Sequence, residues 1–383
     1  MFSQLFGVLP CSKLYTTPEL KLISIPVVIS TVMGIFQSFL MFTVFYSIIL
    51  RGLNLKRTTV LLYSVTCYVE FLMFIRISRV WPKITLLWQN LEASIFFQMP
   101  YSLFKPFALR VVIWISSAVV MINIFIEHFY YWFQAIETSE KHRTFCNHTV
   151  GFLENLYVQE APFFAFWIPS NYFSFAMYEW LNLSMTYARS FIDIFIMCVS
   201  IGLTMRFNQI YMRINFVARK SMPPIFWYQV QRDFMALRKL MLLINNNITQ
   251  MILISSLNNL YYICTQLFYG FSHVDNLVYF WYSLAFIVGK ALMSMMASAS
   301  IALCSVKIRL AIELVSSTSW SPEAENFSKY LNDEMPCFNG CGMFFVTRKL
   351  ILGMAASVVT YEIYLRELVD ITQANTEFIC RKK

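Results

Sequence analysis

The fold of this chain is decided by one stretch, residues 343–370, MFFVTRKLILGMAASVVTYEIYLRELVD. The stretch is long enough for a membrane helix, and its apolar run passes through Thr360 and Tyr361 before it meets Glu362, Arg366 and Glu367. A charge on a lipid-facing helix costs roughly 2.5–3.5 kcal/mol on insertion scales, so such groups generally face protein, water or the membrane interface. The stretch therefore predicts a membrane helix that forms one wall of a water-filled space.

The composition indicates a membrane protein throughout. Of the 383 residues, 58% are hydrophobic and 13% are charged, whereas globular chains are about 45–50% apolar and about 25% charged. The formal net charge of +9 would suggest nucleic-acid binding in a soluble chain. Here, however, Lys and Arg cluster between apolar runs, where they act as topology signals. We therefore expect a polytopic membrane protein with no nucleic-acid partner.

Seven segments are long and apolar enough to cross a bilayer, which takes roughly 17–25 helical residues. They are residues 24–50, 58–75, 108–133, 187–205, 240–271, 277–306 and 343–370. With the N-terminus inside, the inner connecting segments hold 16 Lys and Arg residues and the outer ones hold 9. The positive-inside rule then predicts an all-α membrane protein of seven transmembrane helices, with a cytosolic N-terminus and an extracellular C-terminus.

The connecting segments carry further expectations. Residues 76–107 are basic and contain Pro82, Pro100 and Pro106, which predicts a positively charged connector with breaks at these prolines. Residues 134–185 are the longest interruption and contain the triplet that begins at Asn147, a glycosylation acceptor if it lies on the luminal side. Between the last two spans, Trp320, Phe327, Tyr330 and Leu331 recur at helical spacing, which predicts a short amphipathic helix on the cytosolic side.

Several motifs together resemble one family. Residues 360–368, TYEIYLREL, resemble the signature of the insect gustatory receptors, in which Thr-Tyr is followed by five mostly apolar residues and then Gln-Phe. The Glu that follows Thr-Tyr is similar to the sugar-receptor branch of that family. Glu367 and Leu368 replace the Gln-Phe pair, and Arg366 is unusual for a pore helix. Five more stretches resemble the same branch: LFGVLP (5–10), SFIDIFIMCVSIGLTMRF (190–207), SSLNNLYYICTQLF (255–268), YFWYSLAF (279–286) and FFVTRKLIL (344–352).

The resemblance implies the insect chemoreceptor fold and a ligand-gated, nonselective cation channel of the plasma membrane. It implies four identical or related subunits, with the last helix of each around one central pore. The parts of the chain are then a cytosolic lead-in (1–23), a six-helix bundle with an outward-facing ligand pocket and cytosolic helix extensions (24–306), a cytosolic amphipathic segment for subunit anchoring (307–342), the pore helix (343–370) and an extracellular tail (371–383).

Within the implied pore helix, four residues are the candidates for the pore and gate: Tyr361, Tyr364, Glu367 and Leu368. They share one face of a helix. Four copies of Glu367 would form an acidic ring that favours cations, and a ring of Tyr364 or Leu368 would gate the pore by dewetting. The alternative is that Glu367 and Arg366 lie at the outer interface, with Arg366 extended toward the headgroups.

For a sugar ligand, the site needs carboxylates or amides beside flat aromatic rings, because sugars present hydroxyl edges and apolar C–H faces. The candidates at similar depth are Asp193, Asn258, Asn259, Tyr262, Gln266, Trp281 and Tyr282, with Glu127 and His128 at the outer end of the third helix. The alternatives are a structural hydrogen bond for Asp193, helix clamping for the amides and an aromatic belt for Trp281 and Tyr282. Lys290 is expected to mark an inner cavity or to pair with a carboxylate such as Glu70.

The sequence shows no catalytic or metal-binding arrangement. The nine Cys are scattered, the four His are dispersed, and neither a phosphate-binding Gly-rich loop nor a nucleophile elbow is present. We therefore expect no enzyme activity, no metal and no cofactor. Two other functions stay open at this point: a metabotropic seven-helix receptor, which requires the opposite orientation, and a small-solute transporter, which typically shows internal repeats.

Overall fold

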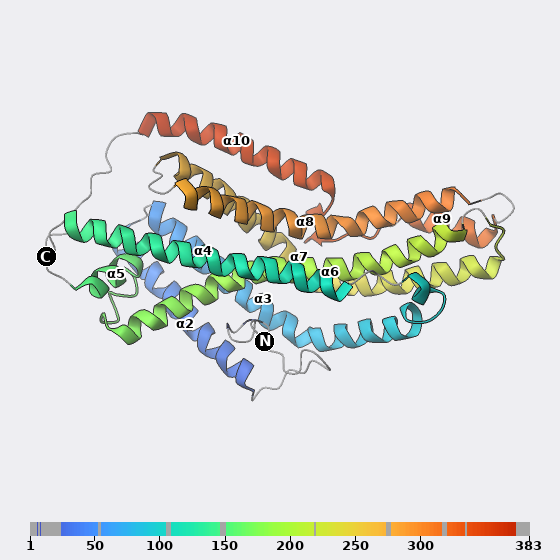
Figure 1. Cartoon of the computed structure of the whole chain (residues 1–383), viewed down its shortest axis with the longest axis horizontal. Helices are drawn as coiled ribbons and strands as arrows, with labels where there is room; N and C mark the ends of the chain where they lie inside the picture. The colour runs from blue at the N-terminus through green and yellow to red at the C-terminus, as the bar shows by residue number, and fades with distance from the viewer. Residues whose placement is uncertain are drawn as a thin grey trace.

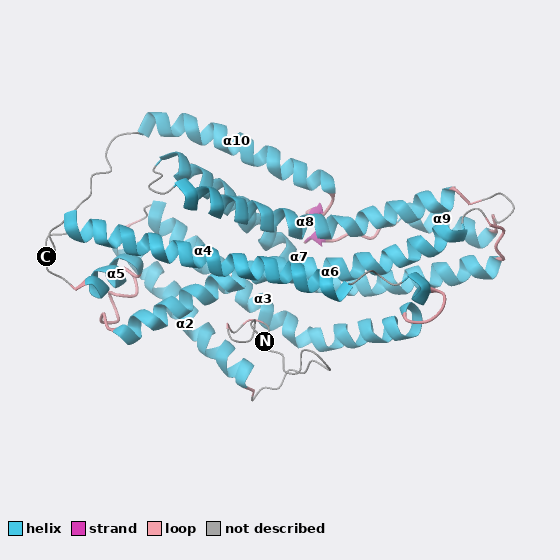
Figure 2. Cartoon of the chain, in the orientation of Figure 1, coloured by secondary structure: helices cyan, strands magenta, loops and turns pink. Residues whose placement is uncertain are grey.

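The chain folds into long helices joined by short connections (Figures 1 and 2). The computed structural model describes residues 6, 8, 24–52, 55–104, 109–145, 151–217, 220–272, 277–315, 320–333 and 335–372, without the side chains of 365–372. The α-helices are α2 (Ile25–Arg51), α3 (Leu55–Leu91), α4 (Leu109–Phe145), α5 (Phe152–Glu160), α6 (Tyr172–Val217), α7 (Pro224–Ser272), α8 (Leu277–Glu313), α9 (Pro322–Asp333) and α10 (Arg348–Thr372). A π-helix (Glu92–Phe96) and a 3-10 helix (Tyr101–Phe104) follow α3, and the strands β1 (Asn339–Gly340) and β2 (Phe344–Phe345) form an antiparallel hairpin before α10.

Six of these helices are long and apolar enough to cross a membrane. They contain the candidate spans Ile25–Leu50, Arg57–Phe96, Val111–Lys141, Tyr172–Val217, Pro224–Phe268 and Leu277–Glu313. The expected all-helical, multi-pass membrane protein is confirmed. The seventh span corresponds to the 25-residue α10 and, like the orientation of the termini, stays a prediction.

The predicted break at Pro82 is wrong, because α3 continues through this residue to Leu91. A proline inside a helix removes one backbone hydrogen bond and costs about 3 kcal/mol. The two turns around it bury Ile77 and Ile84 in the main core, and this burial offsets the cost. The long interruption expected over 134–185 is also shorter than predicted, because α4 runs on to Phe145 and α6 already begins at Tyr172.

The main core lies along α6, which packs most extensively on α8. At one end of the bundle α9 covers α7, burying Ala324, Phe327 and Leu331, so the expected amphipathic helix is confirmed at 322–333. Trp320 precedes that helix and is exposed. Tyr330 accepts a hydrogen bond from the Arg238 guanidinium, which ties α9 to α7.

The β-hairpin holds the start of α10 against α7. The backbone N–H of Asn339 donates to Asn245 Oδ1 (3.0 Å), and the Thr249 hydroxyl donates to the Asn339 side chain (2.8 Å). The backbone N–H of Cys341 donates to the same hydroxyl (2.6 Å). From this anchor α10 runs along α7 and α8, on the side of the bundle opposite α2 (Figure 1).

Two residues of the expected cytosolic lead-in, Phe6 and Val8, are buried in the main core. The Ser184 hydroxyl of α6 donates to the Phe6 carbonyl (2.9 Å), and the Phe6 ring lies 4.4 Å from that of Tyr187. At least this part of the lead-in is therefore attached to the helix bundle. The rest of 1–23 and residues 373–383 lie outside the described residues.

Candidate functional site: an outer cavity above a charged layer

A cavity of about 510 Å³ lies at the end of the bundle where α3, α6 and α8 begin and α4 ends. We call it the outer cavity, because the orientation predicted from the sequence places this end of the bundle outside the cell. It is lined by Leu40, Val60, Tyr63, Ser64, Tyr131, Gln134, Ala135, Thr138, Gln159, Glu160, Ala161, Pro162, Phe163, Phe164, Tyr178, Asn182, Met185 and Tyr279. Its volume is within the range of about 300–1,000 Å³ that small-molecule sites occupy.

The outer cavity combines flat aromatic rings with polar groups. The Tyr131 hydroxyl donates to the Glu160 carboxylate, and the Tyr178 hydroxyl donates to the Glu160 backbone carbonyl (2.9 Å). Within the described part of the chain, the lining amides of Gln134, Gln159 and Asn182 form no hydrogen bond. Each amide offers both donors and acceptors. The cavity can therefore hydrogen-bond a ligand that carries several hydroxyl groups.

Tyr63 connects the cavity to the interior of the membrane bundle. Its hydroxyl lies 3.1 Å from Thr186 Oγ1, and its ring lies edge-on to Tyr262 at 6.3 Å. The Arg189 guanidinium lies over the Tyr262 ring at 4.2 Å and near the Tyr63 ring at 5.8 Å. Such cation–π contacts are worth about 2 kcal/mol when desolvated, and they place a positive charge one layer below the cavity wall.

A charged layer follows deeper in the bundle. Lys290 of α8 pairs with Asp193 of α6 (Nζ to Oδ2, 3.0 Å), and their side chains are 3% and 2% exposed. The other oxygen of Asp193 accepts hydrogen bonds from Ser255 (2.5 Å) and Asn259 (3.1 Å) of α7. The pairing of Lys290 with a carboxylate is thus observed, but the partner is Asp193 and not the expected Glu70.

Glu70 of α3 forms a second link in this layer. Its Oε1 accepts a hydrogen bond from Asn258 of α7 (2.6 Å), while its Oε2 is buried with no hydrogen-bond partner among the described residues. A buried carboxylate oxygen without a partner costs about 1–3 kcal/mol or more. The folded chain therefore tolerates one unpaired oxygen in a carboxylate whose other oxygen is hydrogen-bonded to α7.

The predicted ligand residues lie below or beside the outer cavity, and none of them lines it. Asp193, Asn258 and Asn259 belong to the charged layer, where both amides clamp α7 to its neighbours. Tyr262 lies between that layer and Tyr63. Gln266 is half-buried farther along α7.

The remaining candidates, on α4 and α8, differ in their surroundings. Trp281 is 59% exposed, as an aromatic residue facing lipid would be. The Tyr282 hydroxyl donates to Asn123 Oδ1 (2.9 Å). Glu127 accepts a weak hydrogen bond from Ser283 (3.5 Å), and His128 lies 4.0 Å from Glu179 in an apolar groove between α4 and α6. The role of all nine residues in ligand binding stays a prediction.

Sequence reasoning missed the cavity residues themselves. Tyr63 lies two turns before Glu70 on α3, and Asn182 lies two turns before Arg189 on α6, so helical spacing from the charged layer could have found them. Gln134, Gln159 and Glu160 fall in the interval 134–185, the predicted interruption between two spans.

The candidate pore helix α10 contacts the bundle along one stripe. Met354 and Val358 are half-buried there, whereas Leu352, Val359 and Tyr364 are 73%, 59% and 60% exposed. Tyr361 is 45% exposed. The side chains of Glu367 and Leu368, and the candidate acceptor Asn147, lie outside the described residues.

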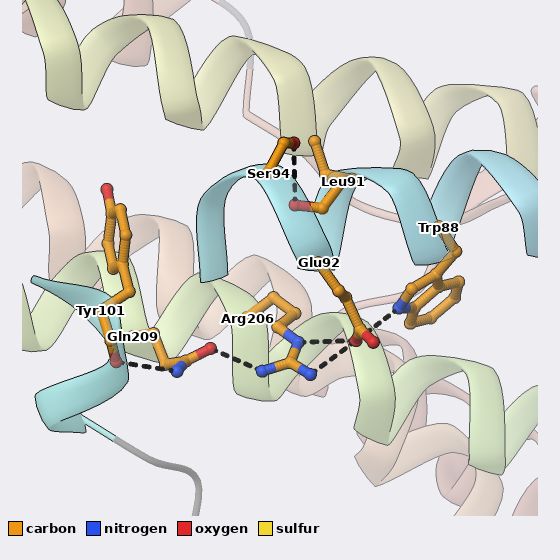
Figure 3. A network of polar contacts seen from close by, with 7 residues as sticks. All are labelled: Trp88, Leu91, Glu92, Ser94, Tyr101, Arg206 and Gln209. Atoms are coloured by element: carbon orange, nitrogen blue, oxygen red, sulfur yellow. Dashed lines mark hydrogen bonds and ion pairs between the residues drawn. The ribbon is translucent and has the colours of Figure 1, made fainter. Parts of the chain in front are cut away.

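A second polar network lies at the opposite end of the bundle (Figure 3). Arg206 of α6 binds Glu92 through Nε (2.9 Å) and Nη2 (2.5 Å), and its Nη1 donates to Gln209 (2.8 Å). Trp88 donates to the same carboxylate oxygen of Glu92 (2.9 Å). Gln209 donates to the Tyr101 carbonyl (3.3 Å), and burial raises the pKa of the Tyr101 phenol, which stays protonated. We call these residues the inner network.

Comparison with known proteins identifies the fold and then the family. The chain superposes on the insect olfactory receptor OR5 from Machilis hrabei with a TM-score of 0.64 and 12% identity over 94% of each chain. On its complex with eugenol the TM-score is 0.58. This chain therefore has the insect chemoreceptor fold.

Comparison of the sequence finds relatives with higher identity than these solved structures. The family model of the trehalose receptors matches residues 1–380. The Drosophila melanogaster gustatory receptor for sugar taste 64b is 32% identical over 376 residues, 96% of this chain and 92% of that protein. The gustatory receptor for sugar taste 61a of the same organism is 31% identical over 83% of this chain and 74% of that protein. The chain belongs to the trehalose receptor family, the sugar branch of the insect gustatory receptors, and it is a receptor rather than an enzyme.

Proposed function

We propose that the chain is one subunit of a sugar-gated, nonselective cation channel of the plasma membrane. The observation that carries the proposal is the outer cavity, in which tyrosine rings surround three amides that have no hydrogen-bond partner in the described part of the chain. Relatives named for sugar taste and for trehalose support a sugar as the ligand. A disaccharide can rest its apolar faces on the tyrosine rings and direct hydroxyls to the amides and to Glu160.

In this proposal, the sugar acts on the charged layer through Tyr63. A ligand that binds the open arrangement better than the closed one shifts the population toward opening. Tyr63 contacts both the cavity and Tyr262 of α7, and α7 also holds the hairpin that begins α10. Of the nine residues predicted for ligand binding, Asp193, Asn258 and Asn259 then act below the cavity by fixing the position of α7.

For the pore, we propose that four subunits place α10 around one axis, with seven spans per subunit, the N-terminus in the cytosol and the C-terminus outside. The exposed apolar surface of α10 supports this arrangement, because it requires cover by protein or lipid. Tyr361, Tyr364, Glu367 and Leu368 are the proposed pore residues. An acidic ring at Glu367 favours cations over anions.

Whole-cell recording in a heterologous host tests the proposal. We expect a cation current evoked by trehalose or another sugar of a panel, from this chain alone or with related subunits. Glu367→Gln should lower the preference for cations, whereas Glu362→Gln, at a half-buried position of α10, should leave it unchanged. No sugar-evoked current in any combination would overturn the gating proposal, and an unchanged ion preference in Glu367→Gln would overturn the acidic ring.

A further inference from the structure

A groove of about 410 Å³ lies between α2 and α3 and takes no part in the proposed sugar site. It is lined by Val27, Ser30, Thr31, Gly34, Ile35, Ser38, Tyr68, Phe71, Leu72, Ile75, Ser78 and Arg79. Gly34 shapes its floor, because a Cβ at this position would lie 2.8 Å from the Phe71 ring. The absence of a side chain at Gly34 allows Phe71 of α3 to lie directly against α2.

The length of the groove matches one leaflet of a membrane. Its lining runs from residue 27 to 38 on α2 and from 79 back to 68 on α3. Eleven residues of helix rise about 16 Å, and half of a hydrocarbon core of about 30 Å is about 15 Å. Because the N-terminal end of α2 and the Arg79 end of α3 meet at the same level, one end of the groove lies at the membrane surface and the other near mid-membrane.

The two ends differ in chemistry. At the surface end, Arg79 is exposed and forms no ion pair among the described residues. Ser30 lines the same groove, is 3% exposed, and its hydroxyl has no hydrogen-bond partner in the described part of the chain. Toward mid-membrane the groove presents the apolar side chains of Ile35 and Leu72, which are 64% and 46% exposed. Ser38 and Tyr68 also line this end, and the Ser38 hydroxyl already donates to the Gly34 carbonyl.

The groove also faces away from the proposed channel axis. α2 and α10 lie on opposite sides of the bundle (Figure 1), and α2 contacts mainly α3. Assembly around α10 therefore leaves the α2–α3 groove toward lipid. An amphiphile of the bilayer, rather than a neighbouring subunit, is the molecule in a position to enter it.

We propose that this groove binds an anionic glycerophospholipid, with its phosphate at Arg79 and Ser30 and one acyl chain between Ile35 and Leu72. The guanidinium supplies the charge complementarity, since a planar arginine fork binds phosphate oxygens in pairs. With the N-terminus in the cytosol, the lipid belongs to the cytosolic leaflet, where anionic headgroups are enriched. The assignment of the leaflet rests on the proposed orientation, and the site itself does not depend on sugar gating.

Native mass spectrometry of the purified full-length receptor tests the site. Palmitoyl-oleoyl phosphatidylserine and palmitoyl-oleoyl phosphatidylcholine are titrated separately onto wild type, Arg79→Gln and Lys349→Gln. One basic residue near a headgroup contributes about 1 kcal/mol, so Arg79→Gln should bind phosphatidylserine about fivefold more weakly. Lys349→Gln, an exposed cation at the start of α10, should bind it as wild type does.

A third variant separates a lipid from a free phosphate. Leu72→Trp fills the apolar part of the groove and leaves its charge intact, so it should weaken phosphatidylserine binding while a titration with inorganic phosphate is unaffected. If Arg79→Gln does not fold, two other results decide the test. Wild type should bind phosphatidylserine more tightly than phosphatidylcholine, and Leu72→Trp should bind phosphatidylserine more weakly than wild type. Wild-type affinity for phosphatidylserine in either Arg79→Gln or Leu72→Trp, or equal wild-type affinity for both lipids, would overturn the proposal.

Discussion

The two ends of the bundle bury charged groups in different surroundings. In the inner network, all three nitrogens of the Arg206 guanidinium donate hydrogen bonds. The rings of Phe96 and Phe97 lie 5.5 and 5.4 Å from the same guanidinium. In the charged layer near the outer end, Asp193 and Lys290 are paired, but Glu70 keeps an oxygen without a partner among the described residues. The outer cavity lies only a short distance from that layer along α3 and α6.

This difference indicates a division of roles. An ion pair whose guanidinium is fully hydrogen-bonded, as at Arg206, makes the helices that it joins rigid, whereas a partly satisfied carboxylate such as Glu70 holds its helices less firmly. Trp88 reinforces the inner end, since it lies so close to α6 that a Cβ on Gly202 would approach its ring to 2.9 Å. We infer that the inner end serves as a rigid anchor and that the outer end responds to ligand.

The largest effect is expected at the inner network. Arg206→Met leaves Glu92 without its charged partner, and breaking a buried ion pair costs about 3–5 kcal/mol. The variant should lose most of its folded, detergent-extractable protein, measured by fluorescence-detected size-exclusion chromatography after heating. Arg309→Gln, which removes only a 4.0 Å contact with Glu313 within α8, is the control. A heat-stable Arg206→Met protein would contradict the anchor role.

At the charged layer, Lys290→Met should cost less, because Asp193 keeps the hydrogen bonds from Ser255 and Asn259. We expect a loss near the lower end of the range, about 3 kcal/mol, together with a shifted sugar response. Adding Asp193→Asn removes the uncompensated charge and should restore part of the thermal stability. If the double variant is less stable than Lys290→Met, the ion pair does not account for the effect.

In the outer cavity, Asn182→Leu should change ligand response with little effect on folding. A lost hydrogen bond is worth about 0.5–1.5 kcal/mol, so the half-activating sugar concentration should rise about two- to tenfold. The heat stability of the ligand-free protein should match wild type, since the amide has no partner among the described residues. Trp114→Leu, at an exposed site of α4 outside the cavity, serves as the control, and equal effects of the two changes would argue against the cavity.

The smallest effect concerns the hairpin before α10. Thr249→Val removes the hydroxyl that contacts Asn339 and Cys341, and a net loss of about 1 kcal/mol follows from one such hydrogen-bonding group. Thr265→Val is the matched control on the same helix, because among the described residues the Thr265 hydroxyl bonds only the Tyr261 carbonyl. Current that declines more steeply with temperature in Thr249→Val than in Thr265→Val would support the coupling of α7 to α10; identical behaviour would argue against it.

Much of the membrane architecture follows from the sequence. Apolar length predicted the six candidate spans, and helical spacing predicted α9 through Phe327 and Leu331, because both signals are local. The charge on Lys290 also implied a carboxylate partner. Its identity as Asp193 depends on how α6 and α8 are rotated about their axes, which a single sequence does not specify.

The outer cavity was harder to predict for a similar reason. Its residues come from α2, α3, α4, α6, α8 and the segment around α5, and many of them lie in the predicted interruption between spans, 134–185. Polar residues in mid-membrane attract notice because their burial is costly. Gln134 and Asn182, near the end of the bundle, carry no such signal, although they line the cavity.

The most direct test is an image of the assembled receptor with trehalose bound. We predict sugar density in each subunit enclosed by Tyr63, Gln134 and Asn182, with four copies of α10 around a common axis. Sugar density elsewhere in the bundle, or α10 turned toward lipid in the assembly, would contradict the account.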